Sequence, residues 1–122
     1  MNIDYTDQQI ERAWTKTRKV DGLDPNIFRL DACGALIMKD KYGQKNRYGW
    51  VIDHIYPQIL GGKDDEINLR ALHYKNEQSK GDDYPSYLSA VYFDGNNNVE
   101  VQKKAIVNSK MRAKLRTLYP DA

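Results

Sequence analysis

An Asp-His pair at the end of a short apolar run is the feature of this chain best suited to chemistry. The pair is Asp53 and His54; Asn68 lies fourteen positions after the histidine. Glu77 follows Asn68 by nine positions. A histidine can take a proton from water at neutral pH. Two carboxylates with no neighbouring thiol form a hard, oxygen-rich ligand set that favours Mg²⁺ or Mn²⁺ over Zn²⁺. A general base, a loop-organising amide and metal-ligating carboxylates are what metal-assisted phosphodiester cleavage requires.

The segments that must position these residues are predicted to be a strand, a long loop, a second strand and a helix, in that order along the chain. Residues 48–55 predict a strand that ends with the Asp-His pair, and residues 56–67 predict a long loop with one proline and a Gly-Gly step. Residues 68–72 predict a second strand, and residues 73–80 predict a polar helix. This order is expected to bring a strand end, a loop and a helix together around one site.

This stretch, residues 48–82, resembles the HNH nuclease motif, also called ββα-metal. The run Asn-Leu-Arg-Ala-Leu-His…Asn…Lys-Gly-Asp, which begins at Asn68, is its most specific part. The segment Phe-Arg-Leu-Asp-Ala-Cys-Gly-Ala-Leu-Ile, which begins at Phe28, also looks like the segment ahead of the motif in small stand-alone bacterial and phage HNH proteins. The resemblance implies an endonuclease that hydrolyses DNA, with double-stranded DNA as its partner and 5′-phosphate and 3′-hydroxyl ends as products.

The resemblance also implies a role for each motif residue. His54 is expected to be the general base, held in one tautomer by a backbone carbonyl of the loop. Asp53 and Glu77 are expected to hold one divalent cation, Mg²⁺ or Mn²⁺. Asn68 is expected to hydrogen-bond across the loop and to keep the end of the His54 strand rigid. The plainer alternatives are a satisfied histidine at a strand end, a turn-capping aspartate, a strand-entry asparagine and an exposed helical glutamate.

Glu77 is the departure from the commoner family pattern, which has His or Asn at that position. A carboxylate can replace either residue as a metal ligand, so the change is chemically tolerable. Asn76, next door, would be the second ligand if the helix began in a different register. His73 shares a helix face with Glu77, but we exclude it from the ligands and expect it to pack or to bind phosphate.

Basic side chains are the expected contacts to nucleic acid. Arg70, Lys75 and Lys80 are the cations nearest the motif and are expected to contact phosphates, with solvated surface charge as the alternative. The chain carries a net charge of +2, and from residue 99 onward six basic residues stand against two acidic ones. This basic end suits either a phosphate-facing helix or a solvated helix face. No recognition helix stands out, so we expect a nicking or weakly selective nuclease unless a protein partner supplies specificity.

The composition is that of an ordinary globular protein with a single domain over residues 1–122, with 40% apolar and 30% charged residues. No apolar run is long enough to span a bilayer, and the N-terminus lacks the signal-peptide pattern. The single cysteine, Cys33, excludes an internal disulfide and a Cys-rich zinc site. A reducing, cytoplasmic location is therefore expected, in a bacterium or, for a phage-encoded protein, in its host.

The remaining segments predict three further elements. Residues 6–18 predict an N-terminal helix, and residues 87–93 and 99–107 flank a turn-rich segment and predict a hairpin. Residues 109–119 predict an amphipathic C-terminal helix with Met111, Leu115, Leu118 and Tyr119 directed inward. The fold class is therefore expected to be α+β: a ββα-metal core with an N-terminal helix, an extra β-hairpin and a basic C-terminal helix.

Two other classes of function remain open. One is a non-cleaving nucleic-acid-binding protein that keeps the HNH scaffold but holds no metal. The other is a protein-interaction module on the same scaffold. The presence of Asp53, His54 and Asn68 together argues against both, because neither role needs that set.

Overall fold

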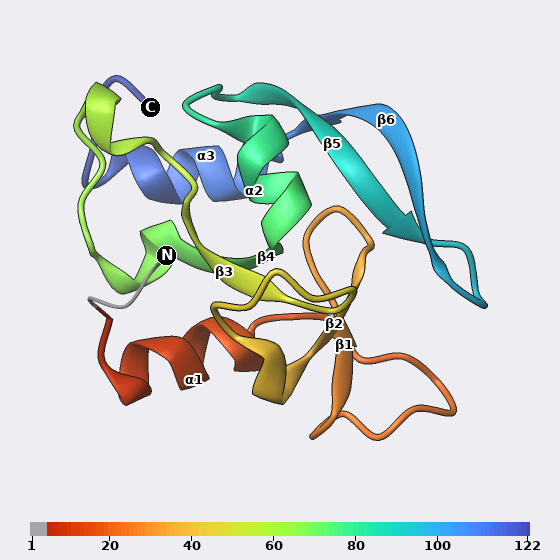
Figure 1. The fold of residues 1–122 in the computed structure, drawn as a ribbon. Coiled ribbons are helices and arrows are strands. Elements are labelled where there is room, and N and C mark those ends of the chain that lie inside the picture. Colours follow the sequence, from red (N-terminus) through yellow and green to blue (C-terminus); the bar gives the residue numbers. More distant parts are fainter. Residues whose placement is uncertain (1–4) are drawn as a thin grey trace.

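The computed structural model describes residues 5–122 as a small α+β fold in which three short antiparallel sheets, each of two strands, pack with three α-helices. The β3–β4 hairpin lies in the middle, between α1 with the β1–β2 hairpin on one side and α2, α3 and the β5–β6 hairpin on the other (Figure 1). No helix in this part of the chain is long and apolar enough to cross a membrane. The elements are α1 (Asp7–Thr15), β1 (Phe28–Leu30), β2 (Leu36–Met38), β3 (Trp50–His54), β4 (Leu69–His73), α2 (Tyr74–Lys80), β5 (Ser86–Phe93), β6 (Asn98–Ile106) and α3 (Ser109–Arg116).

The expected N-terminal helix is present as α1, and it begins with a reciprocal capping box. The Thr6 side chain accepts from the backbone N–H of Gln9, and the Gln9 side chain accepts from the backbone N–H of Thr6. The helix ends at Thr15, earlier than expected, because Arg18 leaves the helix to form an antiparallel bridge with Leu30 in β1. The short helix thereby stays anchored at both ends.

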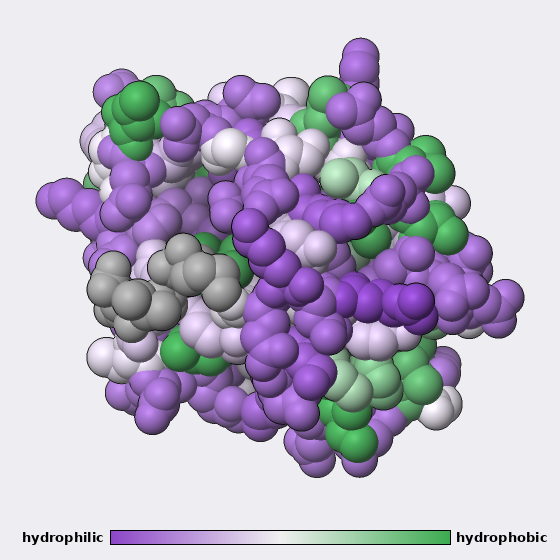
Figure 2. Space-filling view, in the orientation of Figure 1, coloured by the Kyte–Doolittle hydropathy of each residue, from purple (hydrophilic) through white to green (hydrophobic). Residues whose placement is uncertain are grey.

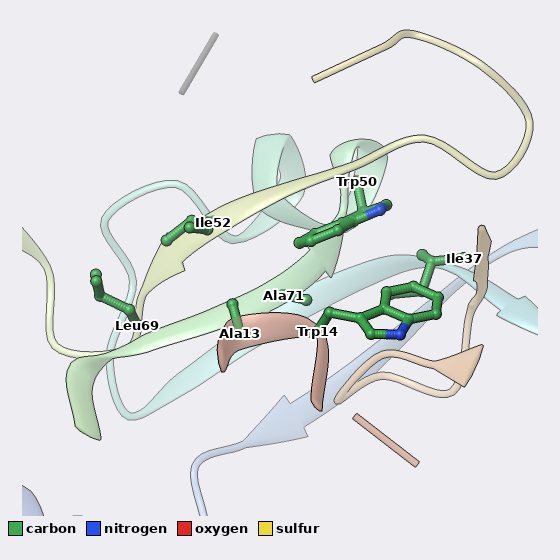
Figure 3. Close-up of a cluster of buried hydrophobic side chains, with 7 residues drawn as sticks. All are labelled: Ala13, Trp14, Ile37, Trp50, Ile52, Leu69 and Ala71. Carbon is green, nitrogen blue, oxygen red and sulfur yellow. The ribbon is translucent and has the colours of Figure 1, made fainter. Parts of the chain in front are cut away.

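The buried face of α1 forms the first core with the central hairpin. Trp14 packs on Trp50 of β3, with ring centroids 5.6 Å apart, and the Trp50 indole N–H donates to the Met38 carbonyl. Burial of such large rings is a principal source of stabilisation in a domain of this size. Figure 3 shows the members of this cluster converging from α1, β2, β3 and β4: Ala13, Trp14, Ile37, Trp50, Ile52, Leu69 and Ala71.

The expected strand–loop–strand–helix order of the motif is present as β3, a long loop, β4 and α2. Asp53 pairs with Arg70 across the hairpin, and His54 pairs with Leu69. The helix α2 follows β4 directly, because His73 ends the strand and caps the helix: its side chain accepts from the backbone N–H of Lys75.

The C-terminal third forms the expected hairpin and helix around a second core. The β5–β6 hairpin contains a register shift between Ser89 and Val91, and α3 begins at an Asn108 cap. Leu118 was expected to face inward but is 47% exposed, because α3 ends at Arg116 and the chain then turns. The core consists of Ile55, Tyr56, Tyr87, Val107, Leu115, Tyr119 and Ala122.

A buried carboxylate, Asp31, joins these parts. It accepts four hydrogen bonds, from the backbone N–H groups of Cys33, Ala35 and His73 and from the Asn76 side chain. The other atoms of the Asn76 amide bond β5: its oxygen accepts from Ala90 and Val91, and its nitrogen also donates to the Val91 carbonyl. Burial raises the pKa of Asp31, and the N–H donors partly counteract that rise.

Replacement of Asn76 by alanine should therefore destabilise the protein strongly. The change leaves Asp31 and three backbone groups of β5 without their partner, and the loss should be about 3 kcal/mol of unfolding free energy or more. Urea unfolding measures the change, with Asn96→Ala on the exposed hairpin turn as the matched control, for which a change within about 0.5 kcal/mol is expected. Equal stability of the two variants would contradict the role given to Asn76.

Candidate functional site

A polar cleft of about 350 Å³ opens where the end of β3, the long loop and α2 meet. Three of the expected site residues, Asp53, His54 and Glu77, line it. Two acids that sequence reasoning did not single out, Asp64 and Asp82, line it as well. The remaining lining residues are Tyr5, Ile52, Pro57, Gln58 and Gly81. None of the described lining residues is a lysine or an arginine, so the cleft is acidic.

Asp53 is buried, and both of its carboxylate oxygens meet cations from the interior. Arg70 donates from Nε to Oδ2 at 3.0 Å, and Lys80 Nζ lies 3.3 Å from Oδ1. Arg70 reaches Asp53 because the two residues are cross-strand partners. Lys80 reaches it from the last turn of α2 and also donates to the carbonyl of His54. Burial lowers the pKa of Lys80, and the charge on Asp53 partly offsets that effect.

His54 is held by two side chains from other segments, Asp64 of the long loop and Tyr5 ahead of α1. Its Nε2 is 2.7 Å from the Asp64 carboxylate and 3.3 Å from the Tyr5 hydroxyl. The resemblance led us to expect a backbone carbonyl as the partner of the imidazole, whereas the nearest acceptor to this nitrogen is a carboxylate. The sequence signal for Asp64 was weak: it stands in an acidic run directly after Gly61-Gly62-Lys63, where exposed charge is ordinary.

Asn68 makes the hydrogen bonds expected of it across the long loop. It is fully buried; its Oδ1 accepts from the Tyr56 N–H at 2.7 Å, and its Nδ2 donates to the carbonyls of Tyr56 and Lys63. The loop closes tightly enough that a Cβ on Gly62 would lie 1.8 Å from the Tyr56 carbonyl oxygen. Asn68 therefore braces the loop that carries Asp64, and it stands behind the cleft wall without lining the cleft.

The helix register places Glu77, not Asn76, at the cleft. The Asn76 amide is fully buried and bonded to Asp31 and β5. Glu77 is half-buried on the cleft side, and its pKa is raised first by burial and then by the negative charge of Asp53, with Lys80 acting in the opposite direction. Mutual repulsion between these two carboxylates favours a cation bound near both.

Each of the three basic side chains expected to contact phosphate is paired with an acidic side chain of the protein. Lys80 is 1% exposed, and Arg70 is engaged by Asp53 and by the Tyr87 hydroxyl. Lys75 is at the surface but forms an ion pair with Glu100. The expectation for Arg70 and Lys80 is corrected on this ground: they neutralise a buried acid, because a charge removed from water needs a partner.

His73 has a structural role. Its Nδ1 accepts from the Lys75 N–H, so the ring proton must sit on Nε2, which lies 2.8 Å from the Arg47 carbonyl oxygen. The ring is buried between these two contacts, and burial lowers the pKa of His73. Of the two roles expected for His73, the structure supports packing, because the ring is buried and both of its nitrogens are engaged within the protein.

Comparison of the chain with protein-family models, with curated proteins and with solved structures found no match. Within residues 5–122, no three His, Cys, Asp or Glu side chains come close enough to form a complete metal-binding group. Asp53 and Glu77 are carboxylates, the ligand type that Mg²⁺ takes alongside water and substrate, but both oxygens of Asp53 already meet Arg70 and Lys80.

The structure makes the stability of the fold depend on the protonation of His73. An unfolded histidine has a pKa of about 6.5, and the pKa of His73 is lower in the folded state. Below pH ~6.5 the unfolded chain binds a proton that the folded chain does not, so stability is complete above this pH and falls as the pH drops through the folded pKa.

Thermal unfolding between pH 7.5 and 5.5 should therefore show a falling midpoint. His73→Asn, which keeps an acceptor for the helix cap but does not titrate, should show a smaller fall. His54 is present in both proteins, so it cannot cause a difference between them. Identical pH dependence in the two proteins would therefore contradict the assignment to His73.

Proposed function

We propose that this chain is a metal-dependent endonuclease of the HNH type that hydrolyses DNA phosphodiester bonds. The observation that supports it best is the meeting of His54, Asp53 and Glu77 in one cleft, with Asn68 bracing the loop behind them. A base and two hard ligands facing one space are the minimum that metal-assisted hydrolysis needs.

His54 would act as the general base. When its Nε2–H donates to Asp64, the other ring nitrogen, Nδ1, is left to take a proton from the water that attacks phosphorus. The Asp64 carboxylate would then stabilise the imidazolium that forms, since it lies 2.7 Å from Nε2. Asp64 is a positioning residue in this mechanism, because it acts through His54.

Asp53 and Glu77 would hold one Mg²⁺ or Mn²⁺. The bound cation supplies stabilisation of the negative charge that develops on the phosphate and on the leaving oxygen. Arg70 and Lys80 already offset the charge of Asp53, so of the two proposed ligands Glu77 carries the less compensated negative charge. The affinity for the cation should therefore depend strongly on Glu77.

A second candidate function is a nucleic-acid-binding protein that does not cleave. It is favoured by one specific observation: each oxygen of Asp53 already meets a cation, Oδ2 the Arg70 guanidinium and Oδ1 the Lys80 ammonium. Such a protein would bind DNA equally well in EDTA and in Mg²⁺.

Conversion of supercoiled plasmid separates the two functions. We expect nicking in Mg²⁺ or Mn²⁺ and none in EDTA, with a loss of about a hundredfold or more in His54→Ala. Ca²⁺ and Zn²⁺ complete the metal series, and His73→Asn, at the other histidine of the chain, is the matched control that keeps activity. Intact DNA binding without cleavage in any metal would support the second candidate and reject the nuclease.

Metal dependence tests the ligand role of Glu77. Glu77→Gln keeps the side-chain volume and removes the charge, so the Mn²⁺ concentration that gives half-maximal nicking should rise about tenfold, the equivalent of a lost pairing of about 1.4 kcal/mol. Glu66→Gln, an exposed glutamate bonded to Arg12 outside the cleft, is the matched control and should leave it unchanged. An unaltered Mn²⁺ requirement in Glu77→Gln would remove Glu77 from the ligands.

A further inference from the structure

Two large apolar side chains project into solvent beside the cleft. Ile59 is 75% exposed and Leu60 is 50% exposed, and Ile59 is the most exposed large hydrophobic residue in the described part of the chain. Figure 2 shows a hydrophobic patch at the upper left, over the 3₁₀ turn Gln58–Leu60, surrounded by polar surface. Apolar side chains that are exposed singly are ordinary at a protein surface, whereas these two neighbours stand together on one turn and form a small apolar projection.

The turn that carries the pair is held in one conformation. The backbone N–H groups of Leu60 and Gly62 both donate to the Pro57 carbonyl, and Gly61 donates to Gln58. Gly61 has a φ of 111°, in the left-handed region that favours glycine. The two side chains are thus presented outward by a closed turn, and the buried Asn68 amide fixes the loop beneath it.

The turn forms part of the rim of the candidate site. Pro57 and Gln58 line the same cleft as His54 and Glu77, so the next two residues lie at its edge. A polymer whose phosphate reaches His54 can pass over this edge, which adjoins Pro57 and Gln58. Ion pairs from Arg70 and Lys80 are not available to it there, because both cations are engaged with Asp53.

We propose that Ile59 and Leu60 form a wedge that enters the minor groove of duplex DNA beside the scissile phosphate and partly unstacks one base step. This inference rests on the proposed nuclease function. Apolar wedges of one or two side chains are sufficient to unstack and kink a duplex. A stable protein partner would need roughly 800 Å² from each side, far more than two side chains supply.

The wedge implies a preference among DNA sequences. Pyrimidine–purine steps such as TA unstack at the least cost, so the protein selects duplexes with such a step at the wedge position. Single-stranded DNA has no paired step to open, so it gains little from these two residues.

The test uses the cleavage-deficient His54→Ala protein in Ca²⁺ and a duplex with 2-aminopurine at a TA step. Binding is followed by anisotropy, and unstacking by the rise in 2-aminopurine fluorescence. Adding Ile59→Ala or Leu60→Ala should abolish most of the fluorescence rise and weaken duplex binding about tenfold, with single-strand binding unchanged. Ile106→Ala, a 62% exposed isoleucine on β6, is the matched control and should retain both signals.

The outcomes separate the wedge from the nuclease. Duplex binding with no fluorescence rise in the parent protein, or an equal rise in the Ile59→Ala and Leu60→Ala proteins, overturns the wedge and leaves the nuclease proposal standing. Absence of DNA binding in both Ca²⁺ and EDTA overturns both proposals.

Discussion

The buried link between Asp31 and Asn76 is the contact on which the arrangement of this fold depends. Each sheet has only two strands, and an isolated two-stranded sheet is marginally stable in water. Asp31 joins the β1–β2 hairpin to the start of α2, and Asn76 joins α2 to β5. Because these groups are withdrawn from water, each unpaired atom would be costly, and the hairpins are held in a single mutual arrangement.

That arrangement also produces the charge distribution of the candidate site. Because α2 is fixed against β5, the buried Lys80 side chain lies beside Asp53, and Glu77 lines the cleft. The cations therefore lie behind Asp53 while the acids Asp64, Glu77 and Asp82 line the opening. An acidic opening repels anions and attracts a divalent cation, so under the proposed nuclease function cation binding and the approach of DNA would be coupled.

The local features of the chain were predictable because they depend on neighbouring residues. The capped N-terminal helix, the hairpin around its turn-rich segment and the C-terminal helix all follow from patterns a few residues long. The hydrogen bonds of Asn68 across its loop were expected only from the resemblance of residues 48–82 to the HNH motif, and the structure contains them. The contacts of His54 with Asp64 and Tyr5 could not be predicted, because they depend on how the long loop and the segment ahead of α1 fold onto the end of β3.

The sequence by itself determined the order of elements and the presence of Asp53, His54 and Glu77 at the end of a strand and on the helix that follows. Only the tertiary structure decided which of Asn76 and Glu77 reaches the cleft, and whether Arg70 and Lys80 face solvent or Asp53. Adjacent residues on a helix point about 100° apart, so a polar helix with no clear apolar stripe leaves its rotation open. Packing of the Asn76 amide against Asp31 and the β5 backbone sets that rotation.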